Sequence, residues 1–370
     1  MNRYPIMIFL NRRKTMTNEL KQELLKAHIY GHTNEQIAAV TGLTAEEVAQ
    51  TLADSAGELA EKRAHISTMT TTPLGAENAL STVKAAVGGK VYYGLDVSVW
   101  NGRVDWKAVK AAGKSFAFIR SGYGNVAAYP RQVDSRFAKN VRNARAAGVP
   151  FGVYHYCYAL TPGAARAEAR GFVAQLDKIK PIPHLVLLDI EEASQHRLSG
   201  TAKAAIIDAF LEIVKSAGYW GAVYSYEAFL STIPAADRGR WTNWVANITR
   251  APAIAYDGWQ YSFTGRVSGI SGDVDLDQTT TDFAAKIKAA GKNGYTKPAA
   301  KALDSEGFKR GDKSLGVYYL KRRLIALGYK LNDDKGFGAG TEKAVNSLLR
   351  KWGYKENGIA GEKFAKFVMR

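Results

Sequence analysis

The sequence has little cysteine, few histidines and no long apolar run. Cys157 stands alone among 370 residues, so no disulfide can form within the chain. The six histidines match neither an HExxH pattern nor a Cys/His ligand spacing, and we expect neither a structural metal nor a cofactor. No apolar run approaches the roughly 18 residues that span a bilayer, so we do not expect membrane insertion. The apolar segment around Cys157 predicts a buried thiol without a catalytic role.

Charge is abundant but unevenly distributed. The formal net charge is +17, divided as zero over residues 1–89, +7 over 90–290 and +10 over 291–370. A basic C-terminal segment indicates a polyanionic partner, which could be nucleic acid, an anionic membrane or an anionic cell envelope. The length exceeds that of one ordinary core, so we expect two or three domains.

Residues 1–63 read as a small helical module. Thr33 with Gln36 and Thr44 with Glu47 each fit a capping box, and Gly42 would form the turn between the two helices. The pattern resembles a helix-turn-helix, which leaves a DNA-binding regulator as an alternative. With no net charge the segment lacks the cations that dominate DNA affinity, so we favour a packing module and expect no nucleic-acid partner. A Thr-, Ala- and Gly-rich linker follows at 64–89.

From residue 90 to 290 the pattern changes to apolar strands alternating with helices, which indicates parallel sheet units. Full helical crossovers separate only the early strands, so we predict a TIM-like (β/α)5(β)3 barrel with hairpin-like later connections. The expected helices are Trp106–Ala112, Asp134–Ala147, Ala164–Leu176 and Ala202–Ala217. The expected strands are Val91–Val97, Phe116–Ser121, Phe151–Cys157, Leu185–Ile190, Ala222–Ser225, Trp244–Ala246, Gly258–Tyr261 and Val274–Leu276.

Acidic residues gather where these strands end. Asp96 lies on the first strand, Asp189 and Glu191 on the fourth, and Asp275 on the last, with Asp273 and Asp277 on the same face. Active-site residues of a β/α barrel occupy the C-terminal ends of its strands. Asp189 and Glu191, about 6.6 Å apart along a strand, can address one substrate. A protonated carboxyl beside a second acid is what glycoside hydrolysis requires, although this spacing does not choose between retention, inversion and substrate assistance.

Eight segments in order then resemble the lysozymes of glycoside hydrolase family 25, also called N-acetylmuramidases. The resemblance covers roughly residues 92–283. The segments are Gly94-Leu-Asp-Val-Ser, Val104-Asp-Trp, Phe116-Ala-Phe-Ile-Arg, Gly152-Val-Tyr-His-Tyr, Leu187-Leu-Asp-Ile-Glu, Val223-Tyr-Ser-Tyr, Trp259-Gln-Tyr-Ser and Gly269 to Asp275.

The resemblance implies cleavage of the β-1,4 bond between N-acetylmuramic acid and N-acetylglucosamine in peptidoglycan. Glu191 matches the general acid, and Asp189 the acid that orients the substrate's acetamido group or stabilises a cationic intermediate. Asp96 and Asp275 match the supporting carboxylates. Asp105 also matches a family position, but it precedes a helix and is better explained as an N-cap.

Aromatic side chains at the same mouth are expected to stack against sugar rings. Tyr226 matches the family's tyrosine on the fifth strand, and Tyr123, Tyr154, Tyr156 and Trp259 are further candidates. Alternation along a strand means that only some of them can face the cleft.

Residues 304–370, after a linker at 291–303, resemble the three-helix peptidoglycan-binding domain found on cell-wall hydrolases. The apolar and glycine framework is present, but Leu348 and Leu349 stand where the family commonly has Phe-Gln. A helical bundle with a merely solvated basic face is the alternative. The basic charge suits an anionic envelope polymer as partner, and we expect a monomer that binds peptidoglycan.

The N-terminal apolar run Ile6–Leu10 has five residues, fewer than the about 7 to 15 of a signal peptide. We therefore expect synthesis in the cytoplasm and action on the wall after release, as in a phage endolysin, with a bacterial autolysin as the alternative. A catalytically dead wall-binding barrel and a chitin-directed glycosidase are the remaining readings.

Overall fold

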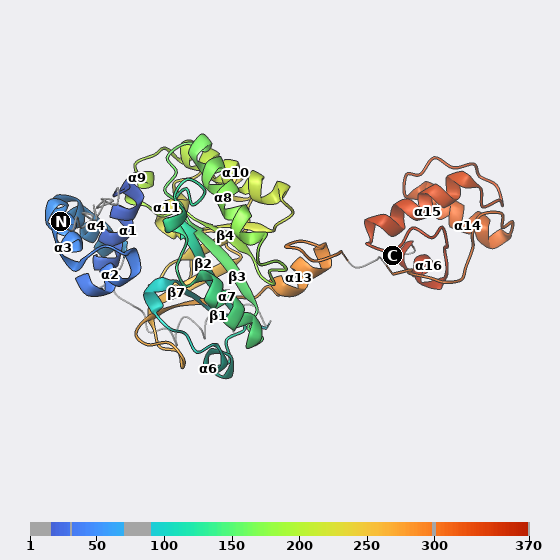
Figure 1. The fold of residues 1–370 in the computed structure, drawn as a ribbon. Helices are drawn as coiled ribbons and strands as arrows, with labels where there is room; N and C mark the ends of the chain where they lie inside the picture. The colour runs from blue at the N-terminus through green and yellow to red at the C-terminus, as the bar shows by residue number, and fades with distance from the viewer. Residues whose placement is uncertain (1–15, 30–31, 70–89, 298–300, 369–370) are drawn as a thin grey trace, which may run out of the picture. The chain divides into compact units, whose positions relative to one another are not determined.

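The computed structural model describes residues 16–29, 32–69, 90–297 and 301–368. The chain forms two compact units, Met1–Thr296 and Lys297–Arg370. The boundary between them lies in the stretch 291–303 that the sequence indicates as a linker. Figure 1 shows helices preceding the barrel within the first unit and a separate helical unit at the C-terminal end.

Within the described residues, four helices precede the barrel in the first unit. Both predicted capping boxes are present, one between Thr33 and Gln36 and one between Thr44 and Glu47, and Gly42 turns the chain at a φ of 68°. The fourth helix continues past residue 63, so the linker expected over 64–89 begins later, and residues 70–89 lie outside the described part. The helices are α1 (Asn18–Ile29), α2 (Asn34–Thr41), α3 (Ala45–Asp54) and α4 (Ala56–Met69).

These helices have a small apolar core of their own, and we call residues 16–69 the N-terminal module. Its core combines Leu24 and Leu25 of α1 with Ile37 of α2, Val48 of α3 and Leu59 of α4. The second helix of the helix-turn-helix, α3, carries Glu46, Glu47 and Asp54 and no Lys or Arg. An acidic helix repels phosphates, so this geometry supports packing over DNA binding.

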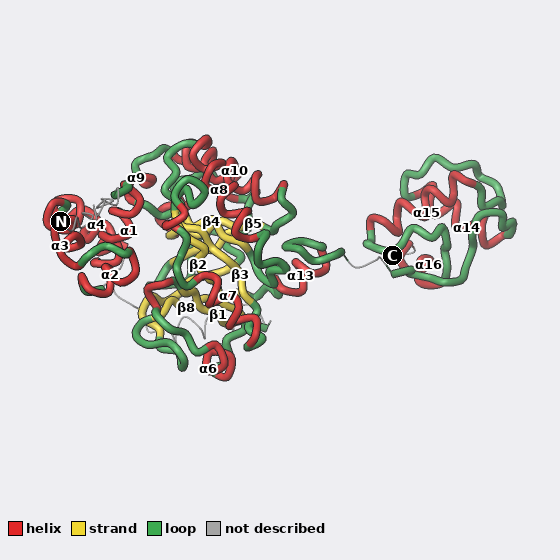
Figure 2. Tube along the Cα trace, viewed as in Figure 1, coloured by secondary structure: helices red, strands yellow, loops and turns green. Residues whose placement is uncertain are grey.

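The eight predicted strands form a closed barrel in sequence order, which confirms the fold class. In Figure 2 the strands gather at the centre of the first unit with helices around them. The strands are β1 (Tyr92–Val97), β2 (Phe116–Tyr123), β3 (Phe151–Tyr156), β4 (Val186–Asp189), β5 (Gly221–Tyr226), β6 (Asn243–Ala246), β7 (Gly258–Gly265) and β8 (Val274–Thr279).

Strand direction corrects one part of the prediction. β1 to β7 run parallel, and β8 is antiparallel to both neighbours. Only β7 and β8 form the expected hairpin-like connection, because β5, β6 and β7 remain parallel. The mouth at the carboxyl ends of β1 to β7 therefore meets the amino-terminal half of β8, and that is where Asp275 lies.

Helices pack around the strands and bury an apolar layer between them. Inside the barrel, Phe116, Phe118 and Trp244 form a second aromatic core with His184 packed against it. The helices of this domain are α6 (Trp106–Ala111), α7 (Phe137–Ala146), α8 (Pro162–Leu176), α9 (Ala193–His196), α10 (Gly200–Ser216), α11 (Glu227–Ser231), α12 (Ala235–Arg238) and α13 (Phe283–Ala290), with 3-10 turns at Val99–Asn101 and Pro130–Gln132.

The second unit contains the helices α14 (Leu315–Ala326), α15 (Ala339–Lys351) and α16 (Glu362–Val368). Leu348 and Leu349 lie in its core, where aliphatic side chains fill the space between the helices. Two short bridges, Phe308 to Ala360 and Lys313 to Gly336, tie the intervening loops together. Within the described parts of both units, no helix is long and apolar enough to cross a membrane.

Candidate active site

One pocket opens at the barrel mouth and collects the four predicted carboxylates. It has a volume of about 1180 Å³, and Asp96, Asp189, Glu191 and Asp275 all line it. Strands β1, β4 and β8 therefore bring together residues up to 179 positions apart in the sequence. Buried acids without this shared opening would cost free energy that the fold does not otherwise recover.

The register between β1 and β8 pairs Asp96 directly with Asp275. Gln260 of β7 donates a hydrogen bond of 2.6 Å from its Nε2 to Asp96 Oδ2. Burial and the charge of Glu191 raise the pKa of Asp96 to about 7 against the lowering hydrogen bond from Gln260. Burial also raises the pKa of Asp275, and the neighbouring charges of Asp96 and Asp277 act in the same direction.

Asp189 is the last residue of β4, and Glu191 follows two positions later, beyond the end of the strand. The Asp189 side chain is buried, and its Oδ1 accepts no hydrogen bond from the described residues. Burial and the charge of Glu191 raise the pKa of Asp189. The site thus holds a carboxyl that favours its protonated form beside a second carboxyl at the pocket surface.

Three of the five predicted aromatic platforms line this pocket, Tyr154 and Tyr156 of β3 and Tyr226 at the end of β5. Trp259 does not. Its neighbour Gln260 faces the pocket, so alternation turns Trp259 outward, where its Nε1 donates to the carbonyl of Asn247 at 2.7 Å. Tyr123 also lies outside the pocket, buried at the end of β2 with the Arg120 guanidinium over its ring.

The pocket lining includes polar residues to which the sequence analysis gave no role, among them Gln260, Asp277 and Lys26. Gln260 and Asp277 belong to barrel strands, and their inward position follows from the alternation on β7 and β8. Lys26 comes from α1 of the N-terminal module, and its Nζ lies 2.5 Å from Glu191 Oε1. Nothing local in the sequence signals the Lys26 contact, because 165 residues separate the two partners.

Two expectations concern groups outside the acid cluster. Asp105 caps α6 by accepting hydrogen bonds from the backbone N–H groups of Lys107 and Ala108, as predicted. Cys157 is buried, and burial raises the pKa of its thiol, which suits an inert packing role. Among the described residues, no group of three or more His, Cys, Asp and Glu side chains could hold a metal ion.

An eight-stranded barrel with acidic side chains converging at one mouth has the architecture of a barrel hydrolase. A profile for glycosyl hydrolases family 25 matches residues 95–270. Lysozyme M1 of Streptomyces globisporus is 32% identical over 225 residues, which cover 54% of this chain and 71% of that protein.

Two solved structures are also similar to part of this chain. A bacterial lysozyme from Streptomyces coelicolor is 30% identical, with 55% of this chain and 97% of that chain covered and a TM-score of 0.45. The CTP1L endolysin is 25% identical, with 63% and 80% covered and a TM-score of 0.47.

The chain belongs to glycosyl hydrolases family 25 and is a glycoside hydrolase. This membership confirms the resemblance to the family 25 lysozymes that the eight sequence segments indicated.

Proposed function

We propose that the protein is an N-acetylmuramidase, which hydrolyses the β-1,4 bond between N-acetylmuramic acid and N-acetylglucosamine in bacterial peptidoglycan. The observation that carries this proposal is the convergence of Asp96, Asp189, Glu191 and Asp275 on one pocket of a family 25 barrel. The name of its relative from Streptomyces globisporus, a lysozyme, supports the same substrate.

In this proposal Glu191 protonates the glycosidic oxygen as the bond breaks. Its position beyond the end of β4, at the surface of the pocket, lets it approach a substrate from the opening. Asp189 lies deeper, and its unpaired Oδ1 is free to contact the acetamido group or to stabilise positive charge at the anomeric carbon. Asp96, fixed by Gln260, and Asp275 beside it set the electrostatic potential of the floor.

Two aromatic rings complete the proposed subsites. Tyr226 is half-buried and lies edge-on to Phe263 of β7, with both rings lining the pocket. A ring held in this way offers a flat apolar face to the C–H face of a pyranose. Tyr156 donates a hydrogen bond of 2.9 Å to Glu192 and lies closer to the acid pair.

Product analysis tests the proposal. Purified peptidoglycan is digested, and the new reducing ends are identified by borohydride reduction and mass spectrometry. We expect reduced N-acetylmuramic acid. Reduced N-acetylglucosamine, or release of fragments from chitin in place of peptidoglycan, would assign a different glycosidase specificity and refute the muramidase.

We also propose that the protein acts as an endolysin, reaching the wall from the cytoplasm after the membrane is permeabilised. The name of a similar protein, the CTP1L endolysin, supports this proposal. Fractionation of intact, non-lysing producer cells tests it, because an endolysin remains in the cytoplasmic fraction. Recovery of the full-length protein from the medium of such cells would identify an autolysin.

A further inference from the structure

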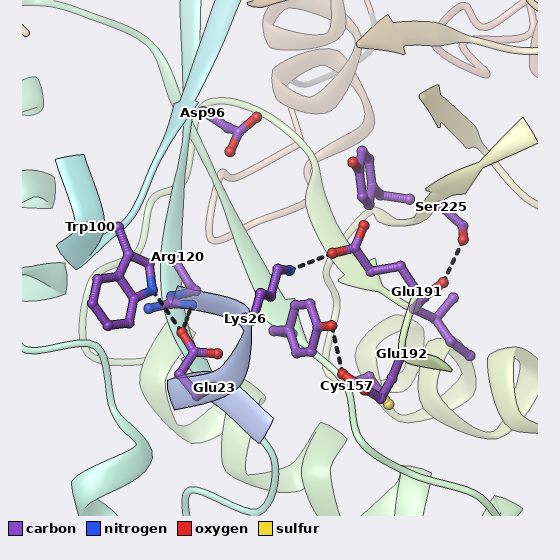
Figure 3. Close-up of polar contacts among 12 residues, drawn as sticks. Glu23, Lys26, Asp96, Trp100, Arg120, Cys157, Glu191, Glu192 and Ser225 are labelled. Carbon is purple, nitrogen blue, oxygen red and sulfur yellow. Dashed lines mark hydrogen bonds and ion pairs between the residues drawn. The ribbon is translucent and has the colours of Figure 1, made fainter. Parts of the chain in front are cut away.

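The N-terminal module contacts the barrel at the mouth through charged side chains. Lys26 of α1 pairs with Glu191, Lys62 of α4 pairs with Glu192, and Glu23 of α1 pairs with Arg120 of β2. In Figure 3 Lys26 extends from α1 toward Glu191, while Glu23 faces Arg120 and Trp100. All three barrel partners lie on or just after β2 and β4, so the module covers that side of the mouth.

Lys26 contacts two groups that the proposed reaction uses, the Glu191 carboxylate and the Tyr156 ring. Its Nζ lies 2.5 Å from Glu191 Oε1 and 3.8 Å from the centre of the Tyr156 ring. A general acid donates a proton to the substrate, whereas an ammonium–carboxylate ion pair requires the ionised carboxylate. A sugar ring cannot stack on the face of Tyr156 that the ammonium group covers. Lys26 therefore occupies both the carboxylate oxygen and the ring face that the substrate would contact.

Glu23 anchors the module. Its side chain is 2% exposed, and it accepts from the Arg120 guanidinium and, at 2.9 Å, from Trp100 Nε1. Burial raises the pKa of Glu23, but the charges of Arg120 and Lys26 outweigh that effect and hold it below its ordinary value. Removing one partner of a buried ion pair strongly destabilises a folded protein. The pairing of Glu23 with Arg120 therefore favours this one docked position of the module.

The same interface also allows the N-terminal module to separate from the barrel. The module has a core of its own, to which the barrel contributes Trp100 as a partly buried neighbour. Arg120 keeps a second partner, Asp134, whose Oδ2 lies 3.0 Å from its Nε, so its charge stays paired when Glu23 leaves.

We propose that the N-terminal module is an autoinhibitory cover of the active site. In the docked form Lys26 holds Glu191 as an ion pair and covers Tyr156, and hydrolysis requires the module to move away. The inference rests on the proposed acid role of Glu191. It assigns a function to the helices that the catalytic barrel does not require.

Matched variants of the full-length chain test the cover. Lys26→Met removes the ammonium group at the site, and Lys21→Met is its control on the same helix, because Lys21 pairs with Glu58 within the module. We expect Lys26→Met to raise kcat on a soluble peptidoglycan glycan about tenfold, as a shift toward the open form would. Lys21→Met should stay within about twofold of the wild type, within the scatter expected of an exposed ion pair.

A second pair of variants acts on the anchor. Glu23→Gln weakens the pairing with Arg120 and should raise kcat in the same way, whereas Glu35→Gln on the exposed surface of α2 should not. The unfolding midpoint of the barrel, measured alongside, shows that each variant is folded. Unchanged or lower kcat in folded Lys26→Met and Glu23→Gln would overturn the cover.

Product identity separates this inference from the proposed function. If wild type and variants all release N-acetylmuramic acid ends at equal rates, the muramidase stands and the cover is wrong. If none of them releases such ends, the proposed function fails, and the acid role on which the cover rests fails with it.

Discussion

At the scale of single residues, the site is a set of carboxyl groups that the fold keeps out of water. Asp96, Asp189, Asp275 and Asp277 all have a raised pKa, and burial is the main cause in each case. Folding therefore favours the protonated form of these side chains. The cost of this arrangement is expressed as a dependence of stability on pH.

Asp96 gives the sign of that dependence. Its pKa rises from 3.8 to about 7 on folding, so the folded state binds the proton more tightly than the unfolded state. The contribution of Asp96 to the free energy of unfolding is fully present below pH 3.8 and is lost as the pH rises through about 7. Glu191 reinforces this shift, while Gln260, Lys26 and Arg120 oppose it.

Replacing Asp96 with Asn should therefore reduce the pH dependence of the unfolding free energy between about pH 5 and pH 7. Between about pH 5 and pH 7 we expect the wild type to lose about 2 kcal/mol more unfolding free energy than Asp96→Asn, at about 1.4 kcal/mol per unit. Urea titrations at the two pH values measure the difference. Parallel losses in the two proteins would show that Asp96 is not the linked group.

Tyr226 and Trp259 differ in what they contribute. Tyr226→Ala should lower kcat/KM about fivefold by removing an aromatic contact with the sugar, without a large loss of stability. Trp259→Phe should instead cost about 1 kcal/mol of unfolding free energy, because the partly buried carbonyl of Asn247 loses its donor. Steady-state kinetics and denaturation of both variants decide the assignment. A large kinetic effect of Trp259→Phe at unchanged stability would place it in the cleft.

The sequence places a side chain at the barrel mouth only where the local pattern also shows which way that side chain points. Asp96, Asp189 and Glu191 could be placed at the mouth because they end apolar strands. Trp259 could not, since a bulge in β7 follows Gln260 and only the three-dimensional register shows which neighbour faces inward. Lys26 was invisible because its contact with Glu191 depends on how two separately folded segments pack.

At the scale of elements, the strands were predicted from their apolar runs and their bounding turns, and all eight are present. The direction of β8 was not predictable from its own residues, because an alternating strand reads alike in both directions. Direction follows from the connection, and the hairpin between β7 and β8 inverts the chain. That inversion brings Asp275 opposite Asp96.

Asp105 offers an element-scale test. Its carboxylate accepts from two backbone N–H groups at the start of α6, at 3.0 and 3.2 Å. Asp105→Ala should cost about 1 kcal/mol of unfolding free energy, the usual effect of losing an N-cap, and leave kcat unchanged. Thermal unfolding and the glycan assay measure both quantities. A loss of kcat without a loss of stability would make Asp105 part of the site after all.

At the scale of the whole molecule, the C-terminal unit has its own core and the most basic segment of the chain. We propose that it binds peptidoglycan and concentrates the barrel on an insoluble substrate. A chain ending at residue 296 should hydrolyse a soluble glycan as the full chain does, but release fragments from intact walls at least about tenfold more slowly at low enzyme concentration. Equal rates on intact walls would remove the binding role.

The sequence predicts the domain pattern from composition and charge, because linkers and helical segments differ in residue content from a β/α barrel. The contact between the N-terminal module and the barrel could not be predicted, because the composition of a segment does not show that Lys26, Lys62 and Glu23 are the side chains that meet a partner. Each of these side chains meets an opposite charge on the barrel.

The central claim is that Glu191 supplies the proton for glycosidic cleavage, and one comparison tests it most directly. The rate of formation of new N-acetylmuramic acid ends is measured for the wild type and for Glu191→Gln, with wall binding and the unfolding midpoint recorded for both. We expect the folded, wall-binding Glu191→Gln protein to lose at least about a hundredfold in kcat, the usual contribution of a general acid. Substantial residual turnover in that protein would contradict the claim.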